Sequence, residues 1–216
     1  MIFSVKDFIR EIYEGKTIGR ILFNWQVKER CKDIKGNIID LACGNNPSYY
    51  RFLPAGLKIL KTDYINKETT NLVVDLNKKL SFYDNEFDIA LVFNAVYIFE
   101  DPIATLAEIK RIIKPGGKII LSSPFSNIET PEPKDFRRLT FEGLETSFKS
   151  VGFHKIEIHR YGERFSSAVN LIHPFFVFNT LRFFVYLASL ILDGLIPKKI
   201  RINNPAPLGY FCIIEK

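Results

Sequence analysis

Five short runs of apolar, β-branched residues recur between residues 37 and 124, and each closes in polar or turn-forming residues. Runs that are apolar on both faces are typical of a parallel sheet covered by helices. Segment 101–117 lies between the last two runs and predicts a helix, because Asp101 can cap its start and Pro102 suits its first turn. Strands that alternate with helices predict an α/β fold with a doubly wound sheet, whose ligands bind beyond the carboxyl ends of the strands. In chain order, the runs are IIDLA, LKILKTD, NLVVDL, FDIALVF and KIILSSP.

The amino-acid composition indicates how many domains the chain forms and in which compartment it works. The chain has 216 residues, 47% of them hydrophobic, which is enough to bury one core and predicts a single domain over 1–216. Three scattered cysteines (Cys31, Cys43 and Cys212) suit neither a disulfide framework nor a zinc site. We therefore expect a protein of the reducing cytoplasm, and the N-terminus shows no secretion signal.

The formal net charge of +6 favours anionic ligands or a membrane surface, although a solvated basic surface would give the same value. Nucleic acid is disfavoured as a partner, because the Lys and Arg residues are dispersed and no nucleic-acid-binding module is evident. His154, His159 and His173 have no Cys or acidic neighbour at a metal-binding spacing, so we expect them to be structural and expect no metal site.

Carboxylates stand near the ends of the first three runs. Asp40 precedes a turn of small and polar residues, where short side chains let backbone amides approach a ligand. Asp63 closes the second run at the position where an acid can bind ribose hydroxyls, and Asp75 falls in the third. Each feature also has a purely structural alternative. The turn after Asp40 would only reverse the chain, Asp63 would be a surface residue that starts a loop, and Asp75 would cap a helix or a turn. A packed core does not require a carboxylate near the ends of three strands. Their presence therefore favours a ligand-binding site. The turn residues are Ala42, Gly44, Asn45 and Asn46.

The chain resembles the class I S-adenosylmethionine-dependent methyltransferases over about residues 35–160. The resemblance implies S-adenosylmethionine as cofactor and a seven-stranded Rossmann-like sheet with an antiparallel last strand. It also implies a division into an N-terminal helical arm, a core, a hydrophobic helical insertion between strands 6 and 7, and a last strand. The matching segments are IIDLACGNNP, KTDY, VVDL, FDIALVFNAVYIFEDP and IKRIIKPGGKIILSSP. The expected divisions are 1–33, 35–160, 162–207 and 208–216.

The same resemblance implies roles for single residues. Asp40 and Gly44 would lie near the methionine moiety, and Asn94 would border it. Asp63 would bind the ribose hydroxyls, and Asp75 with Leu76 would contact adenine. The other expected cofactor contacts are Ala42, Asn45 and Tyr64.

This chain departs from the family pattern at two places. The family turn often reads D-x-G-x-G-x-G, whereas Ala42 and Asn46 replace its first and third glycines here. Ala42 is tolerated at little cost if its φ is negative, which is the expectation for alanine. Relatives often carry His in the segment YIFEDP, but this chain has Glu100, so a catalytic His is not supported there.

Segment 129–162 resembles the P-x-D-x-x-R-x-T segment of methyltransferases from polysaccharide-biosynthesis clusters, with Asp135, Arg138 and Thr140 at the matching positions. Arg137 and Arg138 could orient an anionic or hydroxyl-rich acceptor. Alternatively, Asp135 and Arg138 hold a loop in place. The expected acceptor contacts are Tyr97, Arg137 and Arg138, and the candidates for a general base are Glu100, Asp101 and Asp135.

The expected insertion contains a long apolar helix that carries a narrow polar stripe. Arg182, Tyr186, Ser189 and Asp193 recur at steps of four, three and four. Arg182 interrupts the apolar run, which disfavours a membrane span. Two interpretations remain open: the helix covers the acceptor pocket or a dimer interface, or segment 170–201 lies on a lipid surface. We favour the first.

The leading hypothesis is a methyltransferase acting on a small, glycosidic or lipid-linked acceptor, located in the cytoplasm or at the inner membrane surface. A nicotinamide-dependent oxidoreductase would share the strand, the turn and the acid at Asp63, but the chain lacks GxGxxG. A non-catalytic, membrane-associated protein that binds S-adenosylmethionine would keep the fold and lose the acceptor pocket.

Overall fold

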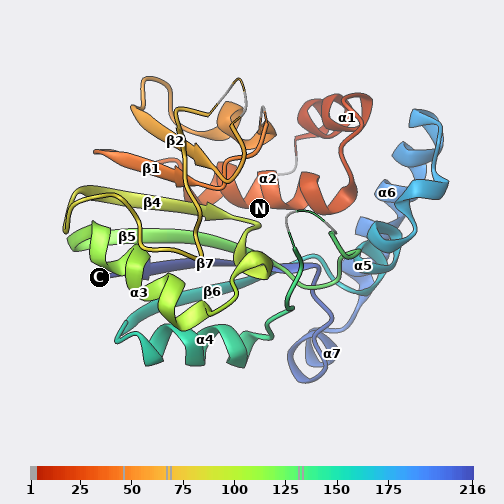
Figure 1. Ribbon diagram of the computed structural model, residues 1–216. Coiled ribbons are helices and arrows are strands. Elements are labelled where there is room, and N and C mark those ends of the chain that lie inside the picture. The colour runs from red at the N-terminus through yellow and green to blue at the C-terminus, as the bar shows by residue number, and fades with distance from the viewer. Residues whose placement is uncertain (1–3, 46, 67, 69, 131, 133) are drawn as a thin grey trace.

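The computed structural model of the chain describes residues 4–45, 47–66, 68, 70–130, 132 and 134–216. Its sheet has seven strands in the order β3-β2-β1-β4-β5-β7-β6 (Figure 1). Strands β1 to β5 run parallel, and β7 is antiparallel to both β5 and β6. The expected fold class is therefore confirmed. The strands are β1 (Ile38–Leu41), β2 (Ile59–Asp63), β3 (Leu72–Val73), β4 (Phe87–Phe93), β5 (Ile113–Pro124), β6 (Lys155–Tyr161) and β7 (Gly209–Glu215).

Helices cover both faces of this sheet, each over its own apolar cluster (Figure 1). Helices α3 and α4 pack on one face, while α1, α2 and part of α6 pack on the other. The α-helices are α1 (Val5–Tyr13), α2 (Ile18–Arg30), α3 (Pro102–Ile112), α4 (Phe141–Ser150), α5 (Arg164–Leu171), α6 (Asn179–Leu195) and α7 (Lys198–Asn203). The short 3-10 helices are η1 (Ser48–Phe52), η2 (Val96–Ile98) and η3 (His173–Phe175).

Local signals fixed two of the predicted helical boundaries. Gly15 predicts a break in the N-terminal helical arm, and the structure has that break between α1 and α2, where the φ of 75° suits glycine. Asp101 caps α3, since its Oδ1 accepts hydrogen bonds from the backbone amides of Ile103 at 2.9 Å and Ala104 at 3.1 Å. Both predictions are confirmed.

Two elements are shorter than the sequence predicts. Pro47 predicts the start of a helix, and the segment after it forms only the five-residue 3-10 helix η1. Strand β3 has two residues, both exposed, so Asp75 lies in the following segment and does not end the strand. The third apolar run therefore contributes little to the sheet.

The insertion between β6 and β7 consists of α5, η3, α6 and α7. The polar stripe of α6 faces the protein, because Tyr186, Ser189 and Asp193 are its buried residues. Its apolar residues Phe184 and Leu195 are exposed instead. The described residues thus cover the polar side of this helix and leave the apolar side open. No helix in the described ranges is both long and apolar enough to cross a membrane.

Asp193 explains why the polar side faces inward. Its carboxylate accepts hydrogen bonds from the backbone amides of Phe165 at 2.8 Å and Ser166 at 3.1 Å, in the first turn of α5. A carboxylate is stabilised there, because the first turn of a helix presents amides without intrahelical partners and the positive end of the helix dipole. Arg201 donates to the Gly194 carbonyl at 2.9 Å, near the end of α6. These contacts tie α5, α6 and α7 together.

We predict that Asp193→Ala lowers the free energy of unfolding by about 1.5 to 3 kcal/mol, because two amides at the start of α5 lose a charged acceptor. Asp33→Ala is the matched control, since Asp33 is exposed and its loss should change stability by less than about 0.5 kcal/mol. Urea denaturation of both variants measures the difference. Equal stability of the two variants would show that Asp193 does not organise the insertion.

Candidate functional site

The turn after β1 meets the end of β2 at the carboxyl edge of the sheet. The Gly44 backbone amide donates a hydrogen bond to Asp63 Oδ2 at 2.7 Å, and the Ile65 amide donates to Oδ1 at 3.2 Å. Gly44 has a φ of 74°, and a Cβ added there would have no heavy atom within 4 Å. The structure thus brings Gly44 and Asp63 together and leaves the space beside Gly44 open.

Ala42 adopts a φ of 65°, so the condition under which alanine would cost little at this position is not met. This left-handed conformation places Cβ close to the following carbonyl oxygen and costs an L-residue about 1 to 2 kcal/mol. The glycine that the family pattern often has at this position would avoid that cost. Asn46, the other departure from the pattern, lies outside the described residues.

Asp40 is fully buried inside β1, one residue before its end. The hydroxyls of Tyr49 at 2.6 Å and Tyr50 at 2.7 Å both donate to its Oδ2, whereas its Oδ1 is buried with no hydrogen-bond partner among the described residues. Burial raises the Asp40 pKa to about 7, against the opposing effect of the two tyrosine hydrogen bonds and of Lys61. The tyrosine pair was not predicted from the sequence, because its position depends on the short helix η1.

The other expected cofactor contacts are spread along the same edge. Asn94 follows β4 with a φ of 52°, and its Oδ1 accepts a hydrogen bond from the Ser122 hydroxyl at 3.1 Å. Asp75 accepts from the Asn77 amide at 3.0 Å. Leu76 is buried in the core next to it. Tyr64 and Asn45 are exposed.

The candidate acidic residues differ in how strongly they are engaged. Asp101 caps α3, as described above. Asp135 Oδ2 accepts from Arg138 Nη2 at 2.6 Å and from the Thr130 amide at 2.9 Å, and Arg138 lowers the Asp135 pKa. The structure therefore shows Asp135 and Arg138 holding a loop. Glu100 is exposed, with Lys134 Nζ 3.8 Å from its carboxylate.

The expected acceptor contacts lie around this loop. The Arg138 guanidinium lies 5.5 Å from the centre of the Tyr97 ring, within cation–π range. Arg137 Nη2 donates to the Glu100 carbonyl at 2.7 Å. The structure thus brings Tyr97, Arg137, Arg138 and Glu100 into one neighbourhood beside the start of α3.

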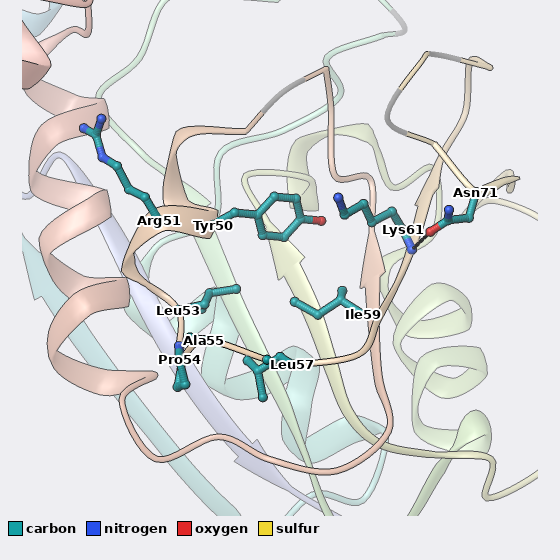
Figure 2. A pocket seen from close by; sticks show the side chains of 10 residues that line it. Tyr50, Arg51, Leu53, Pro54, Ala55, Leu57, Ile59, Lys61 and Asn71 are labelled. Atoms are coloured by element: carbon teal, nitrogen blue, oxygen red, sulfur yellow. Dashed lines mark hydrogen bonds between the residues drawn. The ribbon is translucent and has the colours of Figure 1, made fainter.

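Two cavities flank the site. A cavity of about 640 Å³ lies between η1 and β2, where Tyr50 of η1 and Lys61 of β2 face each other (Figure 2). It contains none of the expected cofactor residues, and it reaches Ile59, the first residue of β2, away from the carboxyl edge. A smaller cavity of about 320 Å³ combines Leu76 with Glu100 and Asp101.

The histidines form no part of this site. His159 Nε2 lies 3.3 Å from the Glu157 carboxylate on β6, and His173 Nδ1 lies 2.8 Å from the Asn170 carbonyl. Across the described residues, no group of three His, Cys, Asp or Glu side chains could hold a metal ion.

Part of the chain is similar to known methyltransferases. A family profile described as a methyltransferase domain matches residues 39–121, which span β1 to β5. A tRNA U34 carboxymethyltransferase from Nautilia profundicola is 29% identical over 40% of this chain and 34% of its own length. A demethylmenaquinone methyltransferase from Corynebacterium kroppenstedtii is 30% identical over 38% of this chain and 39% of its own length. The chain thus spans well under half of these relatives.

The fold is shared more widely than the sequence. The crystal structure of a SAM-dependent methyltransferase from Archaeoglobus fulgidus superimposes with a TM-score of 0.60 at 16% identity. The alignment covers 99% of this chain and 100% of that one, so the whole architecture is common to both.

We predict that Ala42→Gly leaves the free energy of unfolding unchanged or raises it by up to about 1 kcal/mol, because relief of the left-handed strain offsets the greater entropy of glycine in the unfolded chain. The same change at Ala104, on the exposed side of α3, should lower stability by about 1 kcal/mol. Chemical denaturation compares the two variants. Similar destabilisation by both would contradict a strained Ala42.

Asp40 predicts a pH-dependent stability. Its folded pKa, about 7, lies above the unfolded value of about 3.9, so its contribution to stability is fully present below pH 4 and is lost as the pH rises through 7. Asp40→Asn removes this titration, and the stability of the variant relative to the wild type should rise between pH 4 and 8 by roughly 2 to 4 kcal/mol. Denaturation at several pH values measures this difference, with Asp33→Asn as the control. A difference that does not change with pH would contradict the raised pKa.

Proposed function

We propose that this chain is a class I S-adenosylmethionine-dependent methyltransferase that transfers the methyl group of its cofactor to a small, glycosidic or lipid-linked acceptor. The observation that carries the proposal is the open turn at Gly44, hydrogen-bonded to Asp63 at the carboxyl edge of the sheet. This is the edge at which open α/β sheets bind their ligands.

The chemistry of the residues present fits this cofactor. S-adenosylmethionine carries an ammonium group and a sulfonium, and Asp40 holds a buried carboxylate oxygen with no partner among the described residues. Asp63 would accept hydrogen bonds from the ribose hydroxyls, and the bare Gly44 backbone would let the cofactor approach closely. The cofactor supplies an activated methyl group when it is bound.

The protein then has to align the acceptor and exclude water, which can supply most of the acceleration of a displacement reaction. A strong general base is not required. Where the acceptor is a hydroxyl, Glu100 is the best placed of the candidate acids, because Asp101 and Asp135 are both held by structural hydrogen bonds. Tyr97, Arg137 and Arg138 would contact the acceptor from the neighbouring loop.

The proposed acceptor class is inferred from the residues of this chain and not from the names of its relatives. The two relatives named above are a tRNA and a demethylmenaquinone enzyme by name, so their names do not select one acceptor. We retain a small, glycosidic or lipid-linked acceptor in a cytoplasmic protein, and a homodimer remains part of the proposal. A nicotinamide-dependent oxidoreductase is disfavoured by the family match and by the absence of GxGxxG from the sequence.

We predict that S-adenosylhomocysteine binds the chain more tightly than NAD in calorimetry, and that Gly44→Val weakens this binding at least tenfold, because its side chain would enter the open space beside the turn. Gly116→Val is the matched control: Gly116 has a φ of 75° and open space around its Cβ position, but it lies at the opposite end of β5. Both variants should lose similar stability, whereas only the first should lose affinity.

Asp63→Ala should weaken binding of S-adenosylhomocysteine by about 1.5 to 3 kcal/mol, the range for hydrogen bonds to a charged group. The dissociation constant is measured at a temperature where the variant remains folded. An affinity equal to that of the wild type would remove Asp63 from the cofactor site.

A further inference from the structure

The outward side of α6 is entirely apolar. Phe184 is 65% exposed and Leu195 is 73% exposed, whereas Tyr186 on the inward side is 1% exposed. The outward residues recur at steps of three and four, as one face of a helix does. The outward row is Leu181, Phe184, Ala188, Ile191 and Leu195.

This orientation is fixed by hydrogen bonds on the inward side. Arg182 Nε donates to the carbonyl of Phe176, in the segment before α6, at 2.6 Å. Asp193 accepts the two amides of α5 described above. Rotating α6 to bury its apolar row would break the hydrogen bonds of Arg182 and Asp193. The fold therefore keeps this apolar row exposed.

Neighbouring segments extend the apolar surface. The chain around η3 presents Phe175 at 79% exposure, and α7 presents Ile202 at 74%. Val177 and Phe178 are similarly exposed between η3 and α6. We call the outward row of α6 together with these four residues the apolar face. Exposed apolar side chains gathered on one insertion are typical of an interaction site.

The exposed charges that the insertion itself carries on α7 are basic. Residues 164–204 contain Asp193 as their only acid, and it is buried. The same range carries five basic residues, of which Lys198 and Lys199 are exposed on α7. The five are Arg164, Arg182, Lys198, Lys199 and Arg201. Two exposed lysines at one end of an apolar surface complement anionic lipid head groups above a hydrocarbon layer.

We infer that the apolar face docks this chain on an anionic lipid bilayer. A second copy of the chain is a poorer occupant, because the insertion offers no exposed acid to pair with the exposed Lys198 and Lys199 of a symmetric partner. A bilayer accepts both components: the apolar side chains enter the acyl boundary, and the lysines stay at the head groups.

The apolar face lies on the same side of the molecule as the candidate cofactor site. Strand β6 runs parallel to β5, because both are antiparallel to β7, so α5 starts at the carboxyl edge of the sheet. The Asn170 amide on α5 donates to the carbonyl of Ser126, which follows β5, at 3.3 Å. Figure 1 shows α6 along the outer margin of this side, between α1 and α7. Docking would therefore hold the strand ends near the bilayer, where a lipid-borne acceptor would be within reach.

The inference is tested by sedimentation of the full chain with vesicles of equal parts phosphatidylglycerol and phosphatidylcholine, against vesicles of phosphatidylcholine alone. We expect binding to the anionic vesicles that weakens as salt is raised. Phe184→Gln with Ile191→Gln should reduce the partition coefficient at least tenfold. The matched control is Tyr83→Gln with Ile103→Gln, which removes two exposed apolar side chains away from the insertion and should bind as the wild type does.

A second variant tests the charge without touching the apolar row. Lys198→Ala with Lys199→Ala should weaken binding to anionic vesicles and leave the melting temperature unchanged, because both side chains are exposed. Failure of the folded wild type to bind anionic vesicles would overturn the inference, as would equal binding by all variants. A monomer–dimer shift caused by the Phe184 and Ile191 changes, without vesicle binding, would assign the face to a second copy and overturn it as well. None of these measurements depends on cofactor binding, so their outcome is separate from that of the proposed methyl transfer.

Discussion

The hydrogen bond from the Gly44 amide to the Asp63 carboxylate joins the ends of β1 and β2, and the candidate site is arranged around it. Parallel pairing of these strands brings their carboxyl ends to one edge, and the left-handed conformations of Ala42 and Gly44 then turn the chain back toward Asp63. Asp40 lies just before this turn, buried beneath two tyrosines of η1. One turn therefore positions a bare backbone segment, the buried acid Asp63 beside it and the buried acid Asp40 before it.

Most of the fold was predictable from sequence features that act within a few residues. Asp101 and Pro102 predicted the start of α3, and the apolar runs predicted the strands, because caps and strand periodicity are local properties of the chain. The positive φ of Ala42 was not predictable from alanine, since a non-glycine residue adopts it only where surrounding structure holds it there. The tyrosine pair on Asp40 was hidden for a related reason, because its geometry depends on the short helix η1 where the pattern favoured a longer one.

The insertion shows more clearly what the spacing of polar residues does not predict. The spacing of Arg182, Tyr186, Ser189 and Asp193 correctly defined one stripe of α6, but spacing alone does not say whether the stripe faces water or protein. Amides at the start of α5 need acceptors, and Asp193 supplies one, which turns the polar side inward and the apolar side out. The property that sets the surface character of α6 is thus the hydrogen-bonding requirement of a neighbouring helix.

The central claim is that the cofactor binds at the strand ends and not in the larger cavity between η1 and β2. Backbone amide chemical shifts recorded by NMR during a titration with S-adenosylhomocysteine test it most directly. The account predicts that the amides of Gly44 and Ile65 shift strongly, because both donate to Asp63, while those of Ala55 and Gly56 in the larger cavity change little. Strong shifts confined to Ala55 and Gly56, with Gly44 and Ile65 unchanged, would contradict it.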